Sequence, residues 1–283
     1  MCNMKRIKVK TDDNIILKGF LFNDTNNSNE CCLFIPGFEG NFVSNDFVDE
    51  LIESFKLENI DFLYAHTRGS FQISNSVKTS PEDRNKIIGT AFEKIEDAVY
   101  DLKRWFEYLE TLNYKKINVI THSFGGVKLI YFLNNCNYKP KLNKIVLLSP
   151  MDLVNRTKKR KKYFAIREEA MNNIQQGFPE RLIKCGFYYQ SSKTFIDMMD
   201  DKTVNCWPIL NTENSNLEYL NNIKQNIVIV YGQEETDFIS SIPNFQKVIP
   251  SNYKFISLPN ANHSYEGVEK ELSTVLVNIL KDE

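Results

Sequence analysis

Short apolar runs alternate with longer stretches of helical periodicity along most of this chain. Runs such as Cys31–Pro36 and Asn226–Gly232 are almost continuously apolar, which is typical of strands buried on both faces of a sheet. Between such runs, apolar residues recur every three or four positions, as in helices that bury one face. The alternation predicts an α/β fold with a mostly parallel central sheet and helices on both of its faces.

The predicted elements follow one another in a regular order. The N-terminal pair of strands is joined through the turn-forming residues Asp12–Asn14. The predicted strands are Lys5–Lys10, Ile15–Phe22, Cys31–Pro36, Asn59–Ala65, Ile117–Ile120, Lys144–Pro150, Asn226–Gly232 and Tyr253–Leu258. The predicted helices include the apolar positions of Phe47–Phe55 and Phe92–Leu109, a helix after Ser123 and one from about Val268.

One long segment, residues 151–225, breaks this alternation. It has no apolar run of strand length, and its helical pattern is interrupted by Gly177, Pro179, Gly186 and Pro208. We therefore predict a helical cap, residues 151–225, inserted into a core made of residues 1–150 and 226–283.

Composition limits the classes of partner. The chain has 283 residues, 42% of them hydrophobic, which is enough for a sizeable core. Its 35 Lys and Arg residues are balanced by 36 Asp and Glu residues, so no global charge favours nucleic acid or a membrane surface. Neither a secretory leader nor a membrane-spanning run is visible, and adjacent Cys31 and Cys32 suggest buried thiols in a reducing compartment. These features predict a cytoplasmic protein without a metal site.

The stretch Asn118–Leu133 passes from a strand to a helix through the residues THSFGG. A side chain at such a corner projects above the carboxyl ends of a parallel sheet, where ligands bind in open α/β folds. Ser123 stands at the corner, and small Gly125 and Gly126 follow it. Ser123 is therefore either a nucleophile or the cap of the following helix.

A nucleophilic serine needs a base, and the chain contains three histidines. His122 directly precedes Ser123 and is expected to point away from it. His66 follows a strand close to Arg68, where a structural role is expected for both residues. His263 stands between the last predicted strand and the last predicted helix, where it is either a base or a loop histidine without a role.

THSFGG between a strand and a helix resembles the nucleophile elbow GxSxG of the α/β-hydrolase superfamily, with Thr121 in place of the first glycine. The resemblance implies an α/β-hydrolase fold in which Ser123 is the nucleophile and His263 the base. It also implies a carboxylate after the strand Asn226–Gly232, where GQEETDFIS offers Glu235 and Asp237 as alternatives. The order of serine, acid and histidine along the chain agrees with this superfamily.

The loop IPGFEGN, residues 35–41, is similar to the HGFGG phrase of the same superfamily, with Pro36 in place of the histidine. The resemblance implies an oxyanion hole made of the backbone N–H groups of Phe38 and Phe124, and it implies no organic cofactor. The phrases TRGSF, HSFGGVKLIYFL and VLLSPMDLV look similar to a bacterial and fungal group that includes siderophore ester hydrolases. That narrower similarity implies an ester of a specialised small molecule as substrate.

The cap contains a strongly basic run, RTKKRKKYF, from Arg156 to Phe164. Such a run is usually the solvated face of a helix. The functional alternative is that it recruits an anionic substrate, the acidic surface of an acyl carrier protein, or a phosphopantetheine group.

The expected activity is that of a serine hydrolase that cleaves a carboxylic ester or thioester of a small molecule through an acyl-enzyme on Ser123. One alternative is an acyltransferase or cyclase that uses the same three side chains. Another is a non-catalytic protein of this fold that binds a ligand or partner, since a fold does not guarantee a function.

Overall fold

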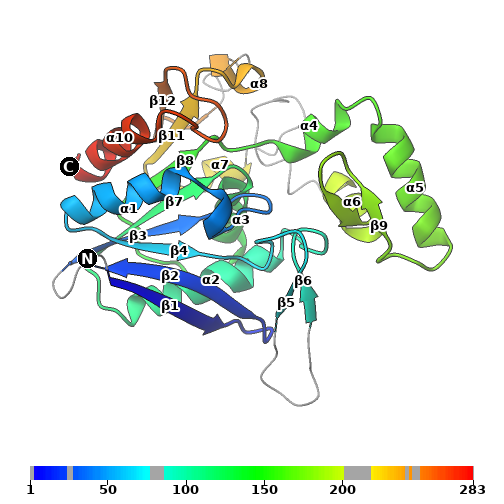
Figure 1. Cartoon of the computed structure of the whole chain (residues 1–283), viewed down its shortest axis with the longest axis horizontal. Helices are drawn as coiled ribbons and strands as arrows, with labels where there is room; N and C mark the ends of the chain where they lie inside the picture. Colours follow the sequence, from blue (N-terminus) through cyan, green and yellow to red (C-terminus); the bar gives the residue numbers. More distant parts are fainter. Residues whose placement is uncertain are drawn as a thin grey trace.

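An eight-stranded sheet runs through the centre of the molecule (Figure 1). The computed structural model describes residues 3–23, 28–76, 86–200, 218–239, 242–243 and 249–282. In spatial order the strands are β1 (Asn3–Lys10), β2 (Ile16–Asn23), β4 (Asp61–Ala65), β3 (Glu30–Ile35), β7 (Lys116–His122), β8 (Ile145–Leu148), β11 (Ile227–Gly232) and β12 (Tyr253–Leu258).

Most neighbouring strands of this sheet are parallel. β2 pairs antiparallel with both β1 and β4, whereas every pair from β4 through to β12 is parallel. The carboxyl ends of β7, β8, β11 and β12 therefore meet at one edge of the sheet, although their segments are far apart in sequence. The mostly parallel sheet predicted from the apolar runs is confirmed.

Helices cover both faces of the sheet, as predicted (Figure 1). On one face α1 (Phe47–Leu57) packs against α10 (Glu269–Lys281), and on the other α2 (Asp97–Glu110) packs against α3 (Phe124–Asn135). Each face has its own cluster of buried apolar side chains. The helices thus enclose the sheet in a three-layer arrangement.

The central strands show why their sequences are almost continuously apolar. In β3, Cys31 and Leu33 belong to the cluster beneath α2 and α3, while Cys32 and Phe34 belong to the cluster beneath α1 and α10. Successive side chains of a strand point to opposite faces, so both sets of positions are buried and both must be apolar.

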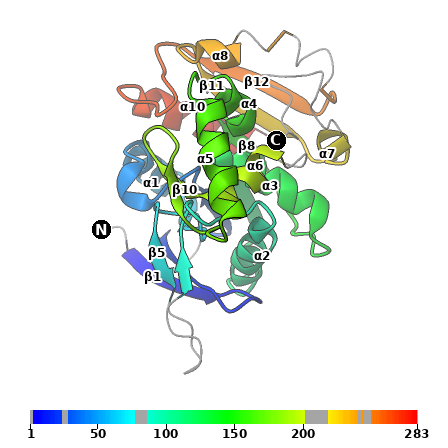
Figure 2. The same cartoon turned by 90° about the vertical axis from the view of Figure 1, so that its right-hand side faces the viewer.

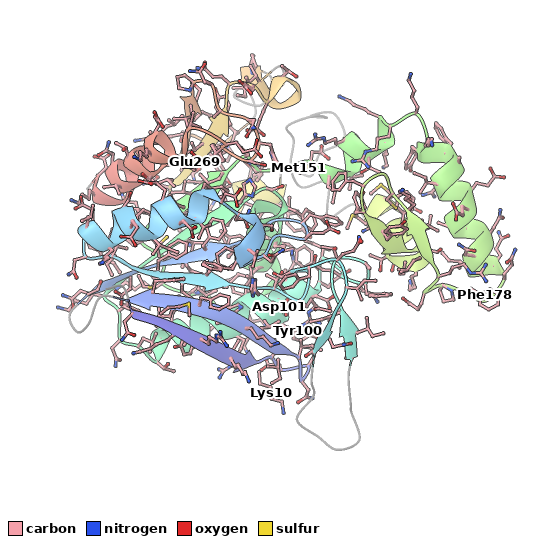
Figure 3. All side chains as sticks on the ribbon, in the orientation of Figure 1. Lys10, Tyr100, Asp101, Met151, Phe178 and Glu269 are labelled. Atoms are coloured by element: carbon pink, nitrogen blue, oxygen red, sulfur yellow. The ribbon has the colours of Figure 1, made fainter. Side chains whose placement is uncertain are left out.

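Residues 151–200 form a separate lobe beside the sheet (Figures 1 and 2). In Figure 3, Met151 marks where the chain leaves the sheet and Phe178 lies at the far end of the lobe. The lobe is not wholly helical, because it includes a hairpin whose strands of three residues each are too short to give a periodic signal. Its elements are α4 (Leu153–Lys158), α5 (Tyr163–Gln175), β9 (Leu182–Lys184), β10 (Tyr189–Ser191) and α6 (Ser192–Asp200).

The domain division proposed from the sequence stays a prediction. Residues 201–217, which include Pro208, lie outside the described part of the chain, and the short helix α7 (Glu218–Asn221) follows them. We call the described residues 151–200 the cap lobe.

The helix expected to include Phe92 and Ile95 begins only at Asp97. The backbone N–H of Lys94 donates to the side chain of Asp97, 2.9 Å away, and Phe92 closes a turn onto Gly89, so the chain approaches the helix through tight turns. Phe92 and Ile95 keep the helical spacing without being helical. A short hairpin, β5 (Ser74–Ser76) and β6 (Lys86–Ile88), also escaped the prediction.

In the described ranges, no helix is both long enough and apolar enough to cross a bilayer.

Candidate active site

Ser123 occupies a strained corner between β7 and α3. Its backbone has φ 54° and ψ −123°, values that a residue with a Cβ rarely adopts. Ser123 stands at the N-cap position of α3, but its side chain makes no capping hydrogen bond. The interpretation of Ser123 as a helix cap is therefore wrong, and its hydroxyl is left for other partners.

Two glycines allow the backbone to approach this corner closely. A Cβ added at Gly37 would lie only 2.8 Å from the Cβ of Ser123, and one at Gly125 would lie 2.5 Å from the carbonyl oxygen of Ile35. Both distances are shorter than real side chains tolerate. Thr121, the residue that departs from the elbow pattern, is fully buried. A Cβ added at Gly126 would lie 3.3 Å from Oγ1 of Thr121.

Three side chains from three loops form one hydrogen-bonded chain. His263 follows β12, and its Nε2 lies 3.0 Å from the hydroxyl oxygen of Ser123. Its other ring nitrogen, Nδ1, lies 2.8 Å from Oε2 of Glu235, which follows β11. We call Ser123, His263 and Glu235 the Ser–His–Glu chain.

The carboxylate of Glu235 is held by several donors. Its Oε1 accepts from the backbone N–H of Gly232 at 2.9 Å and from the hydroxyl of Ser149, which also lies 2.7 Å from the hydroxyl of Tyr265. Burial by itself raises the pKa of Glu235, but the hydrogen bonds from His263, Ser149 and Gly232 outweigh it and hold the pKa below its ordinary value.

An ionised carboxylate can only accept hydrogen bonds, which determines the tautomer of His263. Nδ1 of His263 must carry the hydrogen that it donates to Glu235. Nε2 is then free to accept the hydrogen of the Ser123 hydroxyl. The arrangement can therefore remove a proton from the serine and return it.

The two alternatives for the acid differ in what the structure describes. Glu235 contacts His263 directly. Asp237 lies in the short helix α8 (Thr236–Ile239), and its side chain falls outside the described part of the chain.

His122 contributes a contact that the sequence did not suggest. Its buried ring lies 5.1 Å from the ring of His263, and its Nε2 lies 2.8 Å from the backbone carbonyl oxygen of His263. A carbonyl oxygen accepts, so Nε2 of His122 donates. Burial, together with the neighbouring His263, lowers the pKa of His122 to about 3, so the ring is neutral near pH 7. His122 thus holds the backbone of the residue that contacts Ser123.

His66 has a different environment, away from this chain. Its Nε2 accepts a hydrogen bond from the backbone N–H of Phe42 at 3.0 Å, and its ring lies among Phe20, Tyr64 and Phe71. Burial lowers its pKa to about 4. The structural role expected for His66 agrees with these contacts.

Phe38 and Phe124, whose backbone N–H groups were expected to bind an oxyanion, lie close together. Their rings are 6.1 Å apart, and a Cβ at Gly37 would lie 3.3 Å from the backbone nitrogen of Phe124. Phe124 is the first residue of α3, where backbone N–H groups have no partner within the helix. The loop that carries Phe38 therefore lies against the start of α3.

A cavity of about 360 Å³ opens beside Ser123. Such a volume is typical of sites for small ligands. Its walls come from the loop after β3, from the loops that carry Ser123 and His263, and from the cap lobe. The cap lobe contributes Met151, Leu153, Arg156, Arg160, Phe187 and Tyr188.

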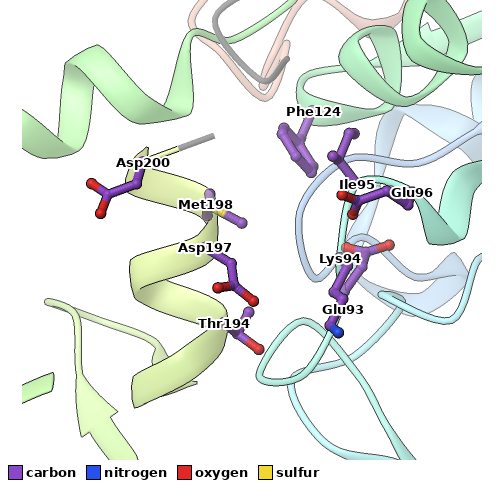
Figure 4. A pocket seen from close by; sticks show the side chains of 9 residues that line it. All are labelled: Glu93, Lys94, Ile95, Glu96, Phe124, Thr194, Asp197, Met198 and Asp200. Carbon is purple, nitrogen blue, oxygen red and sulfur yellow. The ribbon is translucent and has the colours of Figure 1, made fainter. Parts of the chain in front are cut away.

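A second cavity, of about 370 Å³, lies between α6 and the segment Glu93–Glu96 (Figure 4). The side chain of Phe124 lines it, and Asp197 and Asp200 face it from the cap lobe. Both aspartates are already paired, Asp197 with Lys193 and Asp200 with Arg167. Of the two cavities, the one beside Ser123 is lined by both Ser123 and His263.

Among the residues that the structure describes, no three His, Cys, Asp or Glu side chains come together in a way that could hold a metal ion.

A mostly parallel sheet with a serine at a strained strand-to-helix corner and a histidine after the last strand defines the class of α/β hydrolases. The chain matches, over residues 22–188, the family described as an alpha/beta hydrolase of unknown function (DUF915). Since the match covers more than half of the chain, this protein belongs to that family of α/β hydrolases. No curated protein matches the chain.

Three solved structures illustrate the similarity of this fold to known proteins. The α/β hydrolase GrgF from Penicillium sp. sh18 is 16% identical, with a TM-score of 0.69 over 99% of this chain and 98% of that chain. A monoglyceride lipase from Saccharomyces cerevisiae is 14% identical, with a TM-score of 0.66 over 96% and 94%. Est1E from Butyrivibrio proteoclasticus, solved with ferulic acid, is 15% identical, with a TM-score of 0.63 over 98% and 100%. At such identities the likeness establishes the fold alone.

Proposed function

We propose that this protein is a serine hydrolase that cleaves a carboxylic ester or thioester of a small molecule. The observation that carries the proposal is the hydrogen-bonded chain from Glu235 through His263 to Ser123 at a strained corner beside a cavity. The monoglyceride lipase among the similar structures is consistent with ester hydrolysis.

In the first half of the reaction, Ser123 Oγ attacks the carbonyl carbon of the substrate while its proton moves to Nε2 of His263. The oxyanion that forms is bound by the backbone N–H groups of Phe38 and Phe124. The bond to the leaving alcohol or thiol then breaks, and His263 returns the proton to the leaving group. Ser123 is left as an acyl-enzyme.

In the second half, His263 removes a proton from a water molecule that attacks the acyl carbonyl. The bond to Ser123 Oγ breaks, Ser123 regains the proton from His263, and the carboxylic acid leaves. Throughout, Glu235 stabilises the positive charge that His263 acquires and keeps the ring in one orientation. His122 is a positioning residue, because it acts on the backbone of His263 and not on the substrate.

Reaction with a fluorophosphonate probe tests the proposal. We expect a covalent adduct on Ser123 in the wild-type protein, located by peptide mapping, and none in Ser123→Ala or His263→Ala. An equal adduct in Ser123→Ala, or none in a folded wild-type protein, would contradict the proposal and leave the non-catalytic binding protein as the better hypothesis.

Transfer of the acyl group to an acceptor other than water stays an alternative prediction. It shares every step up to the acyl-enzyme, so analysis of the products formed with candidate acceptors decides it. An acyl carrier protein as partner and a siderophore-type ester as substrate are likewise predictions. Release of the acyl group from a loaded carrier protein tests the first, and hydrolysis of such an ester tests the second.

A further inference from the structure

Two arginines of the cap lobe line the cavity beside Ser123. Arg156 belongs to α4, and Arg160 follows the end of that helix. Both come from the basic run noted in the sequence. The cavity thus has Ser123 and His263 on its core side and two arginine residues on its cap side.

Arg160 is held in place by the cap lobe. Its Nη1 donates to the carbonyl oxygen of Cys185 at 2.7 Å, and its guanidinium carbon lies 5.6 Å from the ring centroid of Tyr188 and 5.9 Å from that of Phe187. A guanidinium has five N–H donors, and the bond to Cys185 uses one of them. The group is therefore oriented while most of its donors are left for a ligand.

Neither cavity arginine forms an ion pair with an acidic residue in the described part of the chain. Nη1 of Arg156 lies 3.4 Å from the sulfur of Met151, and in the described ranges no carboxylate forms an ion pair with Arg156 or Arg160. Arg167, elsewhere in the cap lobe, pairs instead with Asp200 at 2.8 Å. The missing acidic partner distinguishes the cavity arginines from an ordinary surface pair.

Glu39 is the acidic side chain that lines the same cavity. Its Oε1 is buried and has no hydrogen-bond partner among the described residues. None of the ion pairs in the described ranges joins Glu39 to Arg156 or Arg160, and burial raises the pKa of Glu39. The exposed lysines around the cavity arginines add to the positive potential; they are Lys158, Lys159, Lys161 and Lys162.

We propose that the cavity beside Ser123 takes an ester that carries a carboxylate or phosphate group, and that Arg156 and Arg160 bind this group. The inference rests on the proposed hydrolase function and names its substrate class. Guanidinium groups match these anions because their N–H donors form two parallel hydrogen bonds to two oxygens. A substrate bound this way would have its anionic end at the cap lobe and its carbonyl at Ser123.

Matched pairs of chromogenic or simple aryl esters test this inference. One pair is 4-nitrophenyl hydrogen glutarate and its methyl ester, with the charge on the acyl side. The other is 4-acetoxybenzoate and its methyl ester, with the charge on the alcohol side, and 4-acetoxyphenyl phosphate extends this arm to phosphate. We expect kcat/KM to be about tenfold higher for the anionic member in at least one arm, in line with one charged hydrogen-bonded contact. Added salt should reduce that preference.

Substitution of the arginines locates the anion site. Arg156→Gln and Arg160→Gln should each remove most of the preference for the anionic ester, measured as the ratio of the kcat/KM values for the anionic and neutral members of a pair. Lys158→Gln is the matched control, because it removes one charge from the same helix at a residue that does not line the cavity. Since Arg160 also holds the carbonyl of Cys185, Arg156→Gln carries the test if Arg160→Gln does not fold.

The outcomes separate the inference from the proposed function. Equal turnover of anionic and neutral esters by a protein that reacts with fluorophosphonate at Ser123 would overturn the anion site alone. An absence of labelling and turnover would contradict the hydrolase proposal. In that case calorimetric binding of glutarate and of inorganic phosphate to the wild type, lost in Arg156→Gln but kept in Lys158→Gln, would still support the anion site, and no binding would overturn it.

Discussion

Two buried polar networks lie on different parts of this molecule, and each borders a cavity, but only one of them ends in a hydroxyl group. Arg68 is surrounded by Asp13, Asp97 and Asp101, which we call the Arg68 cluster. All five N–H donors of its guanidinium meet a carboxylate oxygen, at distances of 2.7 to 3.1 Å. The Ser–His–Glu chain is equally well held at the Glu235 end, but its other end, Ser123, borders a cavity.

The difference teaches how a structural network can be told from a reactive one. The guanidinium of Arg68 has no N–H donor left for another molecule. The Arg68 cluster therefore holds the loops after β1 and β4 against α2. The Ser–His–Glu chain ends in a hydroxyl that is not used for helix capping. We therefore expect changes in the Arg68 cluster to alter stability, and changes in the Ser–His–Glu chain to alter chemistry.

The largest expected effect is the loss of the acid at Glu235. Glu235→Ala should lower kcat for an aryl ester by about 10⁴-fold, because His263 loses the group that fixes its tautomer and stabilises its charge. Asp237→Ala is the matched control and should stay within about threefold of the wild type. Steady-state kinetics with 4-nitrophenyl acetate measure both, and a larger loss in Asp237→Ala would transfer the role of the acid to Asp237.

The next effect concerns stability. Arg68→Met should lower the free energy of unfolding by about 3–5 kcal/mol, because Asp101 would remain fully buried without its counter-charge. Arg104→Met, in the same helix α2 as Asp101, removes a partly exposed pair with Glu107 and should cost less than about 1 kcal/mol.

Urea unfolding measures the effect of Arg68→Met, and the rate of fluorophosphonate reaction of the folded variant should remain near that of the wild type. A variant of unchanged stability that no longer reacts would show that the two networks are not separate.

The buried histidine His66 makes the stability of the protein depend on pH. The folded-state pKa of His66, about 4, lies below its unfolded value of about 6.5, so the unfolded state takes up the proton first as the pH falls. The stabilising contribution is complete above about pH 6.5 and is lost progressively toward pH 4. His66→Gln should therefore reduce the loss of stability between pH 7 and pH 4.5 by about 2 kcal/mol. Urea midpoints across this range measure it, and parallel pH curves for the two proteins would contradict the buried neutral state of His66.

The smallest expected effect is that of the positioning contact from His122. His122→Phe keeps an aromatic ring but removes the hydrogen bond to the carbonyl of His263, and it should lower kcat about tenfold with little change in KM. His122→Gln, which restores an N–H donor, should recover part of the loss. If both variants keep the wild-type kcat and pH profile, the contact only stabilises the fold.

The sequence alone was enough for the features that depend on local pattern and chain order. Continuous apolar runs predicted β3, β7, β8 and β11 because strands covered on both faces need apolar residues at every position. The corner at Ser123 and the place of His263 after the last long strand were also visible. In the cap, by contrast, the hairpin β9–β10 was missed, because three-residue strands have too few positions for a periodic signal.

The tertiary structure decided what depends on distances between segments that are remote in the chain. It brought Glu235 to His263 at 2.8 Å, whereas the sequence left Glu235 and Asp237 as alternatives. It turned His122 toward the backbone of His263, 141 residues away, although the sequence suggested only that His122 points away from Ser123. It also brought Arg156 and Arg160 of the basic run to the wall of the cavity. Such contacts depend on how the sheet stacks its loops at one edge, and residue types and their spacing do not encode that directly.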